Sequence, residues 1–194
     1  KQKGIIEQQK NKVEKQKEVI EEAHRESTDS IQYAKRIQSA ILPPPKLVKE
    51  YLPQSFILYK PKDVVAGDFY WMESVPGQNL ILFAAADCTG HGVPGAMVSV
   101  VCNNGLNRSV REYGITDPGK IRDKTREIVI QEFEKSEEEV KDGMDIALCA
   151  LHSPSHSQSV LQYAGAHNPL WIVRDGNILE TKANKQPIGQ FDSP

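Results

Sequence analysis

The chain has 194 residues, with 24 Lys or Arg against 26 Asp or Glu, so its formal net charge at pH 7 is −2. This balance lacks the basic field of nucleic-acid-binding proteins and argues against nucleic acid as a partner. No apolar run reaches the roughly 18 residues that a transmembrane helix needs, and the first residues lack a signal-peptide core. The three cysteines form no CxxC pair, which favours a reducing compartment, so we expect a cytoplasmic protein.

The first 42 residues predict a long charged helix, because they contain no proline before Pro43 and one glycine, Gly4. Positions seven apart carry apolar or small residues, namely Ile6, Val13, Ile20, Ser27, Ala34 and Ile41. This heptad spacing is typical of a parallel coiled coil, and it predicts a homodimer through residues 1–42. Glutamines in the alternate seam positions weaken that pairing, so a solvated helix packed on its own domain is the alternative.

Three prolines at residues 43–45 end this helix, because proline lacks the N–H and clashes with the preceding turn. We therefore divide the chain into a helical linker, residues 1–42, and a domain, residues 43–194. Apolar runs in the domain predict strands at 55–60, 69–72, 79–87, 146–151, 159–165, 169–173 and 177–181. Helical spacing predicts helices at 93–113 and 117–134, and the acidic run at 134–143 predicts a helix end and a loop.

The order of these segments predicts the fold class. Strands precede the two helices and further strands follow them, and Asp175-Gly176 between the last two strands is a strong hairpin signal. Consecutive strands joined by tight turns pair in antiparallel fashion. We therefore expect an α+β fold, mainly an antiparallel β-sandwich flanked by helices in an αββα arrangement, preceded by the long N-terminal helix.

Two aspartates at the ends of predicted strands are the best candidates for chemistry. Asp68 and Asp87 both lie among glycines, and the second is followed by a predicted helix start at Val93. Carboxylates are the ligands that Mg²⁺ and Mn²⁺ prefer, and a helix N-terminus attracts phosphate. A single aspartate of this kind is as often an N-cap or a turn former. The pair together favours a site for metal ions and an anion.

The sequence resembles the SpoIIE-like branch of the metal-dependent PPM (type 2C) protein serine/threonine phosphatases over about residues 39–194. The matching strings are Ser39-Ala40-Ile41-Leu42-Pro43, Gly67-Asp68-Phe69-Tyr70, Asp87-Cys88-Thr89-Gly90-His91-Gly92, Asp142-Gly143-Met144-Asp145, Tyr163-Ala164-Gly165-Ala166-His167-Asn168-Pro169 and Gln186-Pro187-Ile188-Gly189. The resemblance implies a β-sandwich with two Mn²⁺ or Mg²⁺ ions at one edge, bridging a water that attacks phosphoserine or phosphothreonine.

The resemblance also assigns roles to residues of the metal site. It makes Asp87 the carboxylate that bridges both ions, and the backbone carbonyl of Cys88 the ligand that follows it. Asp68 becomes the upstream acid, which binds directly or holds metal-bound water. Asp142 or Asp145 resembles the acidic position that recruits a third metal in some relatives, although either residue is equally well the tail of the acidic run.

Other residues near these strings are candidates for substrate contact or positioning. His91, between Gly90 and Gly92, lies four residues after Asp87, whereas the histidine of type 2C relatives lies two after it, so we expect a positioning role at the helix start. His167 is read as a turn histidine at the sheet edge, with direct metal binding as the less favoured alternative. Lys62 is a candidate contact for a substrate phosphate, and a solvated loop is the alternative.

Two further metal-binding aspartates of the family have no counterpart here, so we expect a fragment that binds metal weakly and has little activity. In a longer protein, the expected function is a phosphatase that acts on a phosphorylated regulatory protein similar to an anti-sigma-factor antagonist. The N-terminal helix would relay a signal from an upstream sensor. The alternative is a catalytically inactive phosphatase-like scaffold that dimerises through its helix and binds a phosphoprotein.

Overall fold

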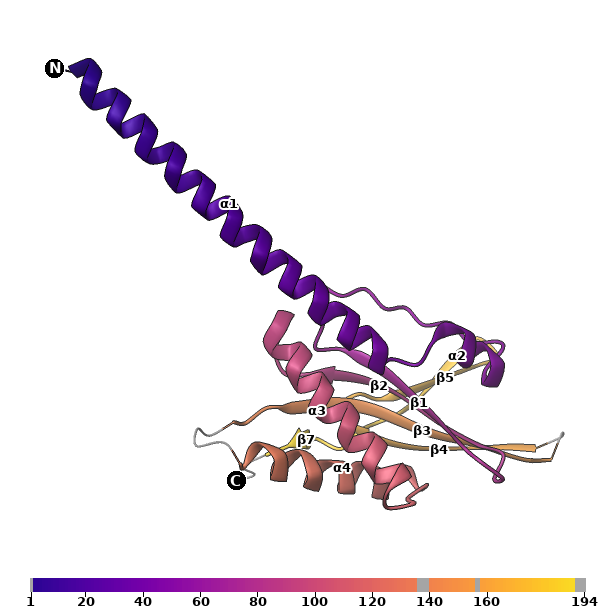
Figure 1. Ribbon diagram of the computed structural model, residues 1–194. Coiled ribbons are helices and arrows are strands. Elements are labelled where there is room, and N and C mark those ends of the chain that lie inside the picture. The colour runs from indigo at the N-terminus through magenta and orange to yellow at the C-terminus, as the bar shows by residue number, and fades with distance from the viewer. Residues whose placement is uncertain (1, 136–139, 156–157, 191–194) are drawn as a thin grey trace.

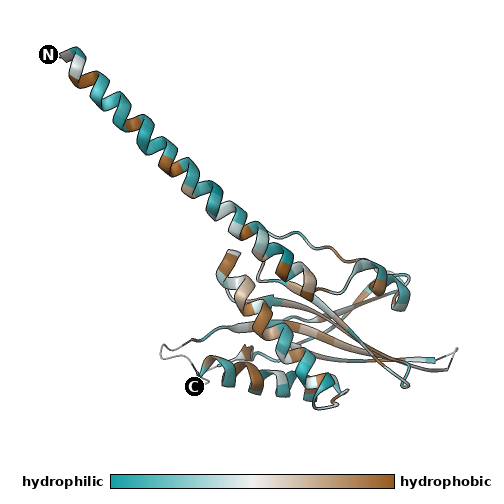
Figure 2. Cartoon of the chain, viewed as in Figure 1, coloured by the Kyte–Doolittle hydropathy of each residue, from teal (hydrophilic) through white to brown (hydrophobic). Residues whose placement is uncertain are grey.

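The computed structural model describes residues 2–135, 140–155 and 158–190. Helix α1 (Gln2–Ile41) is one continuous helix of 40 residues, which confirms the predicted long N-terminal helix. Figure 1 shows that most of α1 projects away from the rest of the molecule, and Figure 2 shows that this part is mainly hydrophilic. Within the described residues, no helix is both long enough and apolar enough to cross a membrane.

The main sheet has the strand order β1-β2-β3-β4, and a short strand β7 also pairs with β3. These strands are β1 (Phe69–Val75), β2 (Leu80–Cys88), β3 (Gly143–Ser155), β4 (Gln158–Ala166) and β7 (Ile188–Gly189). A second, two-stranded sheet pairs β5 (Leu170–Arg174) with β6 (Asn177–Thr181). All pairs of strands are antiparallel, which confirms the predicted α+β class.

The predicted hairpin between the last two strands is confirmed. Asp175 and Gly176 have φ angles of 52° and 75°, the left-handed values that a type I′ turn requires at both central residues. This turn matches the right-handed twist of the flanking strands, which explains why an Asp-Gly pair stands there.

Helices α3 (Gly92–Arg111) and α4 (Pro118–Phe133) pack against the main sheet and enclose the core (Figure 1). The most deeply buried apolar side chains come from both layers and include Leu82, Leu106, Ile121, Ile146 and Leu148. The two helices approach closely at Gly105, where an added Cβ would lie 3.2 Å from Cγ2 of Thr125. Alternating strand residues and one stripe of each helix therefore bury a single core.

The strand predicted at residues 55–60 is wrong. These residues form neither a helix nor a strand, and Phe56 is 89% exposed. Apolar alternation describes a side-chain pattern, whereas a strand also needs a neighbour for its backbone hydrogen bonds, and no described strand pairs with this segment. Of the acidic run at 134–143, residues 136–139 lie outside the described residues.

Two elements were not predicted. Helix α2 (Pro45–Tyr51) begins inside the proline triplet, because proline is well suited to the first position of a helix, where its missing N–H costs nothing. Strand β7 has only two residues and is specified by its contact with β3, so its own sequence carries almost no pattern.

Candidate functional site

Asp68 and Asp87 meet at one end of the main sheet. The antiparallel register of β1 and β2 pairs Phe69 with Ala86, so the next residue of each strand lies at the same edge. The pKa of Asp68 is raised by partial desolvation, and further by the hydrogen bond to Asp87 and its negative charge. The two carboxylates therefore lie within hydrogen-bonding reach of each other at this edge.

Three glycines allow this meeting. A Cβ added at Gly67 would lie 2.6 Å from the carbonyl oxygen of Gly90 and 3.0 Å from that of Cys88. A Cβ at Gly95 would lie 2.5 Å from the same Gly90 oxygen. The loop before β1, the loop after β2 and the start of α3 thus touch backbone to backbone, and a side chain at either position would separate them.

Asp145 faces the same site from β3. It is the cross-strand partner of Asp87, and directly paired residues in an antiparallel sheet project their side chains from the same face. Thr89 fastens the two strands beyond this point, because its hydroxyl accepts from the Gly143 N–H at 3.0 Å and its N–H donates to the Gly143 carbonyl at 2.9 Å. Asp87 and Asp145 therefore project from the same face of the sheet, at neighbouring ends of β2 and β3.

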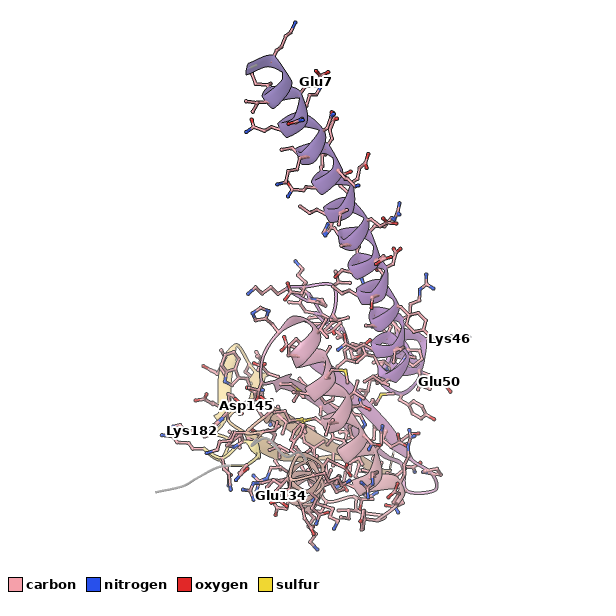
Figure 3. The ribbon with its side chains drawn as sticks, turned by 60° about the vertical axis from the view of Figure 1, so that its left-hand side comes forward. Glu7, Lys46, Glu50, Glu134, Asp145 and Lys182 are labelled. Carbon is pink, nitrogen blue, oxygen red and sulfur yellow. The ribbon has the colours of Figure 1, made fainter. Side chains whose placement is uncertain are left out.

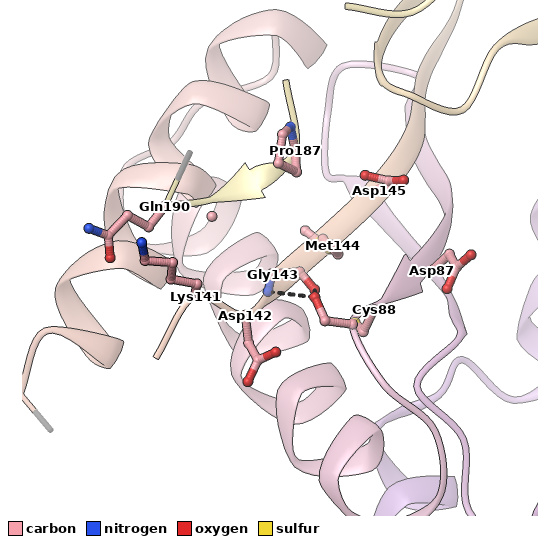
Figure 4. Close-up of a pocket in the computed structure, with 11 residues that line it drawn as sticks. Asp87, Cys88, Lys141, Asp142, Gly143, Met144, Asp145, Pro187 and Gln190 are labelled. Carbon is pink, nitrogen blue, oxygen red and sulfur yellow. Dashed lines mark hydrogen bonds between the residues drawn. The ribbon is translucent and has the colours of Figure 1, made fainter. Parts of the chain in front are cut away.

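A cavity of about 180 Å³ opens beside these strand ends (Figure 4). It is lined by Asp87, Cys88, Thr89, Lys141, Asp142, Gly143, Met144, Asp145, Pro187, Gly189 and Gln190. Asp142 and Asp145, which the sequence left as alternatives, both line it, whereas Asp68 lies outside its lining. The cavity is polar and acidic, which suits a cation more than an apolar ligand.

The two candidate histidines each bond to an aspartate. His167 has a φ of 56°, and its Nδ1 lies 2.8 Å from Oδ1 of Asp145. His91 lies at the N-cap of α3, and its Nδ1 lies 2.9 Å from Oδ2 of Asp63. His167 therefore lies against Asp145, an acidic residue of the cavity. His91 lies between the loop before β1 and the start of α3.

The loop residues around His91 have separate roles. Gly90 and Gly92 have φ angles of 82° and 61°, a left-handed conformation that glycine adopts without strain. They turn the chain sharply from β2 into α3. Lys62 is exposed, which fits the solvated-loop alternative as well as a contact with substrate.

Sequence reasoning missed Gln38, which ties the end of α1 to the loop that carries Asp68. Its side chain is 6% exposed, its Oε1 accepts from the Ala66 N–H at 3.1 Å and its Nε2 donates to the Ala66 carbonyl at 2.5 Å. The same Nε2 donates to Oγ of Ser99 on α3 at 3.0 Å. No local signal in the sequence marks this glutamine, since its hydrogen-bond partners are far along the chain. Asp63, the partner of His91, lies in the same loop as Asp68.

The donors at the site fit a hard divalent cation. The Asp68 and Asp87 carboxylates and the Cys88 carbonyl are oxygen ligands, and a cation between the two carboxylates would offset their mutual repulsion. The Cys88 thiol is not a candidate ligand, because a hydrogen bond with Cys102 and burial raise its pKa. Among the described residues, no group of three or more His, Cys, Asp or Glu side chains is assembled for metal binding.

Comparison with protein families identifies the family to which most of the domain is similar. The model of the family described as Stage II sporulation protein E (SpoIIE) matches residues 77–194. Among curated proteins, no sequence matches the chain.

Comparison with solved structures finds the SiaA-PP2C domain of Pseudomonas aeruginosa, with a TM-score of 0.70 and 29% identity over 88% of this chain. The chain spans 65% of the length of that structure. The phosphatase domain of SpoIIE from Bacillus subtilis, determined with a fragment of its regulatory domain, gives a TM-score of 0.47 at 21% identity over 64% of this chain and 33% of that one. The RsbU and RsbW domains of a Mycobacterium tuberculosis protein give a TM-score of 0.48 at 21% identity, over 66% of this chain and 33% of that one. The last two likenesses are too distant to support an argument.

Proposed function

From the premise that the chain belongs to the SpoIIE family of PPM phosphatases and has the PP2C-type fold, we propose that it is part of a metal-dependent protein serine/threonine phosphatase. The observation that carries the proposal is the Asp68–Asp87 carboxylate pair at the sheet edge, held by the backbone contacts of Gly67 and Gly95. The proposed substrate is phosphoserine or phosphothreonine on a regulatory protein.

In this proposal Asp68, Asp87 and the Cys88 carbonyl hold Mn²⁺ or Mg²⁺ ions. The ions, when bound, would neutralise the phosphoryl group and activate a water for attack. Two side-chain hydrogen bonds position the residues of the site. The bond from His167 orients Asp145, and the bond between His91 and Asp63 holds the loop before β1 against α3. The N-terminus of α3 supplies amide groups to a phosphate.

Substitution of the paired aspartates tests the proposed reaction. In a longer chain that carries the downstream aspartates, Asp68→Asn and Asp87→Asn should each lower Mn²⁺-dependent hydrolysis of a phosphoserine peptide more than about 100-fold, since even residues behind metal ligands contribute about 10- to 100-fold. Asp117→Asn is the matched control, because asparagine also caps the start of α4. Equal activity of all three variants would refute the assignment.

The scaffold alternative makes a different prediction for the same longer chain. The specific observation in its favour is that the described residues assemble no three-ligand group. A scaffold would bind its phosphoprotein without Mn²⁺-dependent turnover before any substitution, whereas a phosphatase would lose turnover in the Asn variants and keep partner binding. Strong turnover by residues 1–194 themselves would contradict the expected weak metal binding.

We also propose that α1 pairs with a second copy of the chain and links the domain to an upstream sensor. Ile6, Val13 and Ile20 support this, because they are 63%, 62% and 67% exposed along one seam. The side chains around Glu7 stand clear of the domain (Figure 3). The last turns of α1 instead pack on α3. The proposed coiled coil therefore concerns the exposed part of α1, and the alternative of a helix packed on its own domain concerns its last turns.

The mass in solution tests the pairing. Residues 1–194 are expected to sediment as a dimer, and the combined Ile6→Asp and Ile20→Asp variant as a monomer, because charge in the seam opposes helix pairing. Gln8→Asp with Asn11→Asp adds the same charge away from the seam and should leave the dimer intact. Monomers in all three samples would exclude the pairing.

A further inference from the structure

The turn after β4 carries His167 in a conformation that the residue does not favour by itself. His167 has a φ of 56°, which lies in the left-handed region. A residue with a Cβ is strained there, and such a conformation persists only where the surrounding structure fixes it. The contacts around this turn therefore determine where the imidazole points.

Backbone hydrogen bonds hold the turn on one side. The N–H of His167 donates to the carbonyl of Asn184 at 2.9 Å, and the N–H of Asn184 donates to the carbonyl of Gly165 at 3.1 Å. Arg122 of α4 donates to the same Gly165 carbonyl, from Nη1 at 3.2 Å. These three bonds fix the chain as far as the N–H of His167, and none of them involves Asn168, the next residue of the turn.

Tyr163 holds the turn at Asn168. Its hydroxyl donates to the carbonyl of Asn168 at 2.5 Å. Tyr163 and Gly165 are two residues apart on β4, so they face the same side of the strand. A Cβ added at Gly165 would lie 1.9 Å from the hydroxyl oxygen of Tyr163 and 2.6 Å from its Cζ. The ring therefore crosses directly over Gly165, and a side chain at that position would leave no room for the bond.

The turn places His167 beside Asp145. Ile146 of β3 pairs with Ala166, the last residue of β4, so Asp145 and His167 are the next residues of the two neighbouring chains. Nδ1 of His167 lies 2.8 Å from Oδ1 of Asp145. An ionised carboxylate can only accept, so the neutral ring donates from Nδ1 and keeps Nε2 as its acceptor. The bond takes one oxygen of Asp145, which lines the cavity at the strand ends (Figure 4).

We propose that Tyr163 is a positioning residue of the candidate site. Its hydroxyl holds the turn at Asn168, the turn keeps His167 in the Nδ1–H form against Asp145, and that bond fixes the direction in which the Asp145 carboxylate faces the cavity. Tyr163 touches no reacting group and acts through His167. Its effect on catalysis rests on the proposed phosphatase function, whereas the orientation of His167 does not.

The form of the His167 ring provides the first test. A ¹H–¹⁵N NMR spectrum of residues 1–194, recorded at a pH at which the imidazole is neutral, shows which ring nitrogen of each histidine carries the proton. His167→Asn assigns the signal, since asparagine tolerates a left-handed backbone. In the unmodified chain we expect the Nδ1–H form, because the bond that one ring nitrogen makes decides which nitrogen is protonated. An Nε2–H form would refute the proposal.

A pair of variants isolates the hydroxyl of Tyr163. Tyr163→Phe should lower the ratio of the Nδ1–H form to the Nε2–H form of His167 about ten-fold or more, the usual contribution of one hydrogen bond to a charged acceptor. Tyr33→Phe removes the same group from a side chain that is 64% exposed on α1, and it should leave the ratio unchanged.

This readout separates positioning from a purely structural role. A general loss of stability changes the fraction of folded molecules, but it leaves the form of His167 within them as it was. An unchanged ratio in folded Tyr163→Phe would therefore overturn the proposal. A Tyr163→Phe chain that does not fold would overturn it as well, because the hydroxyl would then be required for the whole fold rather than for the turn.

Activity in a longer chain that carries the downstream aspartates connects the turn to the reaction. Tyr163→Phe should lower kcat for Mn²⁺-dependent hydrolysis of a phosphoserine peptide about 10- to 100-fold, the usual effect of a residue that orients a metal site from behind. Tyr33→Phe should have no effect. Equal turnover in both variants would refute the role in the reaction. Absence of turnover before any substitution would refute the proposed function instead, and the spectrum of His167 would still decide the positioning.

Discussion

Gly67→Ala is expected to destabilise the chain by about 3 kcal/mol, because the new Cβ would lie 2.6 Å from a backbone oxygen that cannot rotate away. To relieve the clash, the loop before β1 must move from the loop after β2, and the carboxylates of Asp68 and Asp87 must separate. In a catalytically competent longer chain, the same substitution should therefore also lower Mn²⁺-dependent activity. Urea denaturation of residues 1–194 measures the loss of stability.

Gly4→Ala is the matched control for this substitution. Nothing lies within 4 Å of a Cβ added at Gly4, which is in the exposed part of α1. Alanine there should leave the denaturation midpoint unchanged or raise it, since alanine is favoured over glycine in a helix by about 1 kcal/mol. If Gly67→Ala unfolds at the same urea concentration as the unmodified chain, the backbone contact does not hold the two loops together.

Gln38→Ala is expected to cost about 3 kcal/mol and to release the end of α1 from the domain. The substitution leaves the N–H and the carbonyl of Ala66 without partners, and each buried unpaired group costs about 1–3 kcal/mol. Amide hydrogen exchange should quicken at residues 31–41 and in the loop before Asp68. Urea denaturation gives the free energy, and the exchange data show where the structure loosens.

Two further variants separate the role of Gln38 from a general effect on the helix. Gln32→Ala, at an exposed position of the same helix, should change neither measurement. Gln38→Glu keeps the size and the acceptor, but its carboxylate cannot donate to the Ala66 carbonyl, so it should behave like the alanine variant. Normal exchange in the loop before Asp68 for both Gln38 variants would disprove the coupling between α1 and the site.

Local pattern accounts for most of the secondary structure. Prolines and glycines, apolar runs and the Asp175-Gly176 turn act over a few residues, so the long helix, both domain helices, the hairpin and most strands could be predicted. The strand prediction for residues 55–60 was wrong for a physical reason. Their apolar alternation is that of a strand, but no described strand pairs with their backbone.

The candidate site was also predicted only in part. Asp68 and Asp87 could be proposed from their place at strand ends among glycines, and their proximity then follows from the register of β1 and β2. Sequence reasoning could not choose between Asp142 and Asp145, because cross-strand pairing and the bond to His167 are contacts between distant segments.

By itself, the sequence determined the long charged helix, the α+β class and the pair of aspartates, because each depends on residue types at short spacing. Only the tertiary structure decided that Gln38 is a buried joint and that three glycines pack backbone to backbone. Polar residues such as Gln38 carry no sign of burial in their own neighbourhood. Whether they face water or a partner depends on the segments that folding brings next to them.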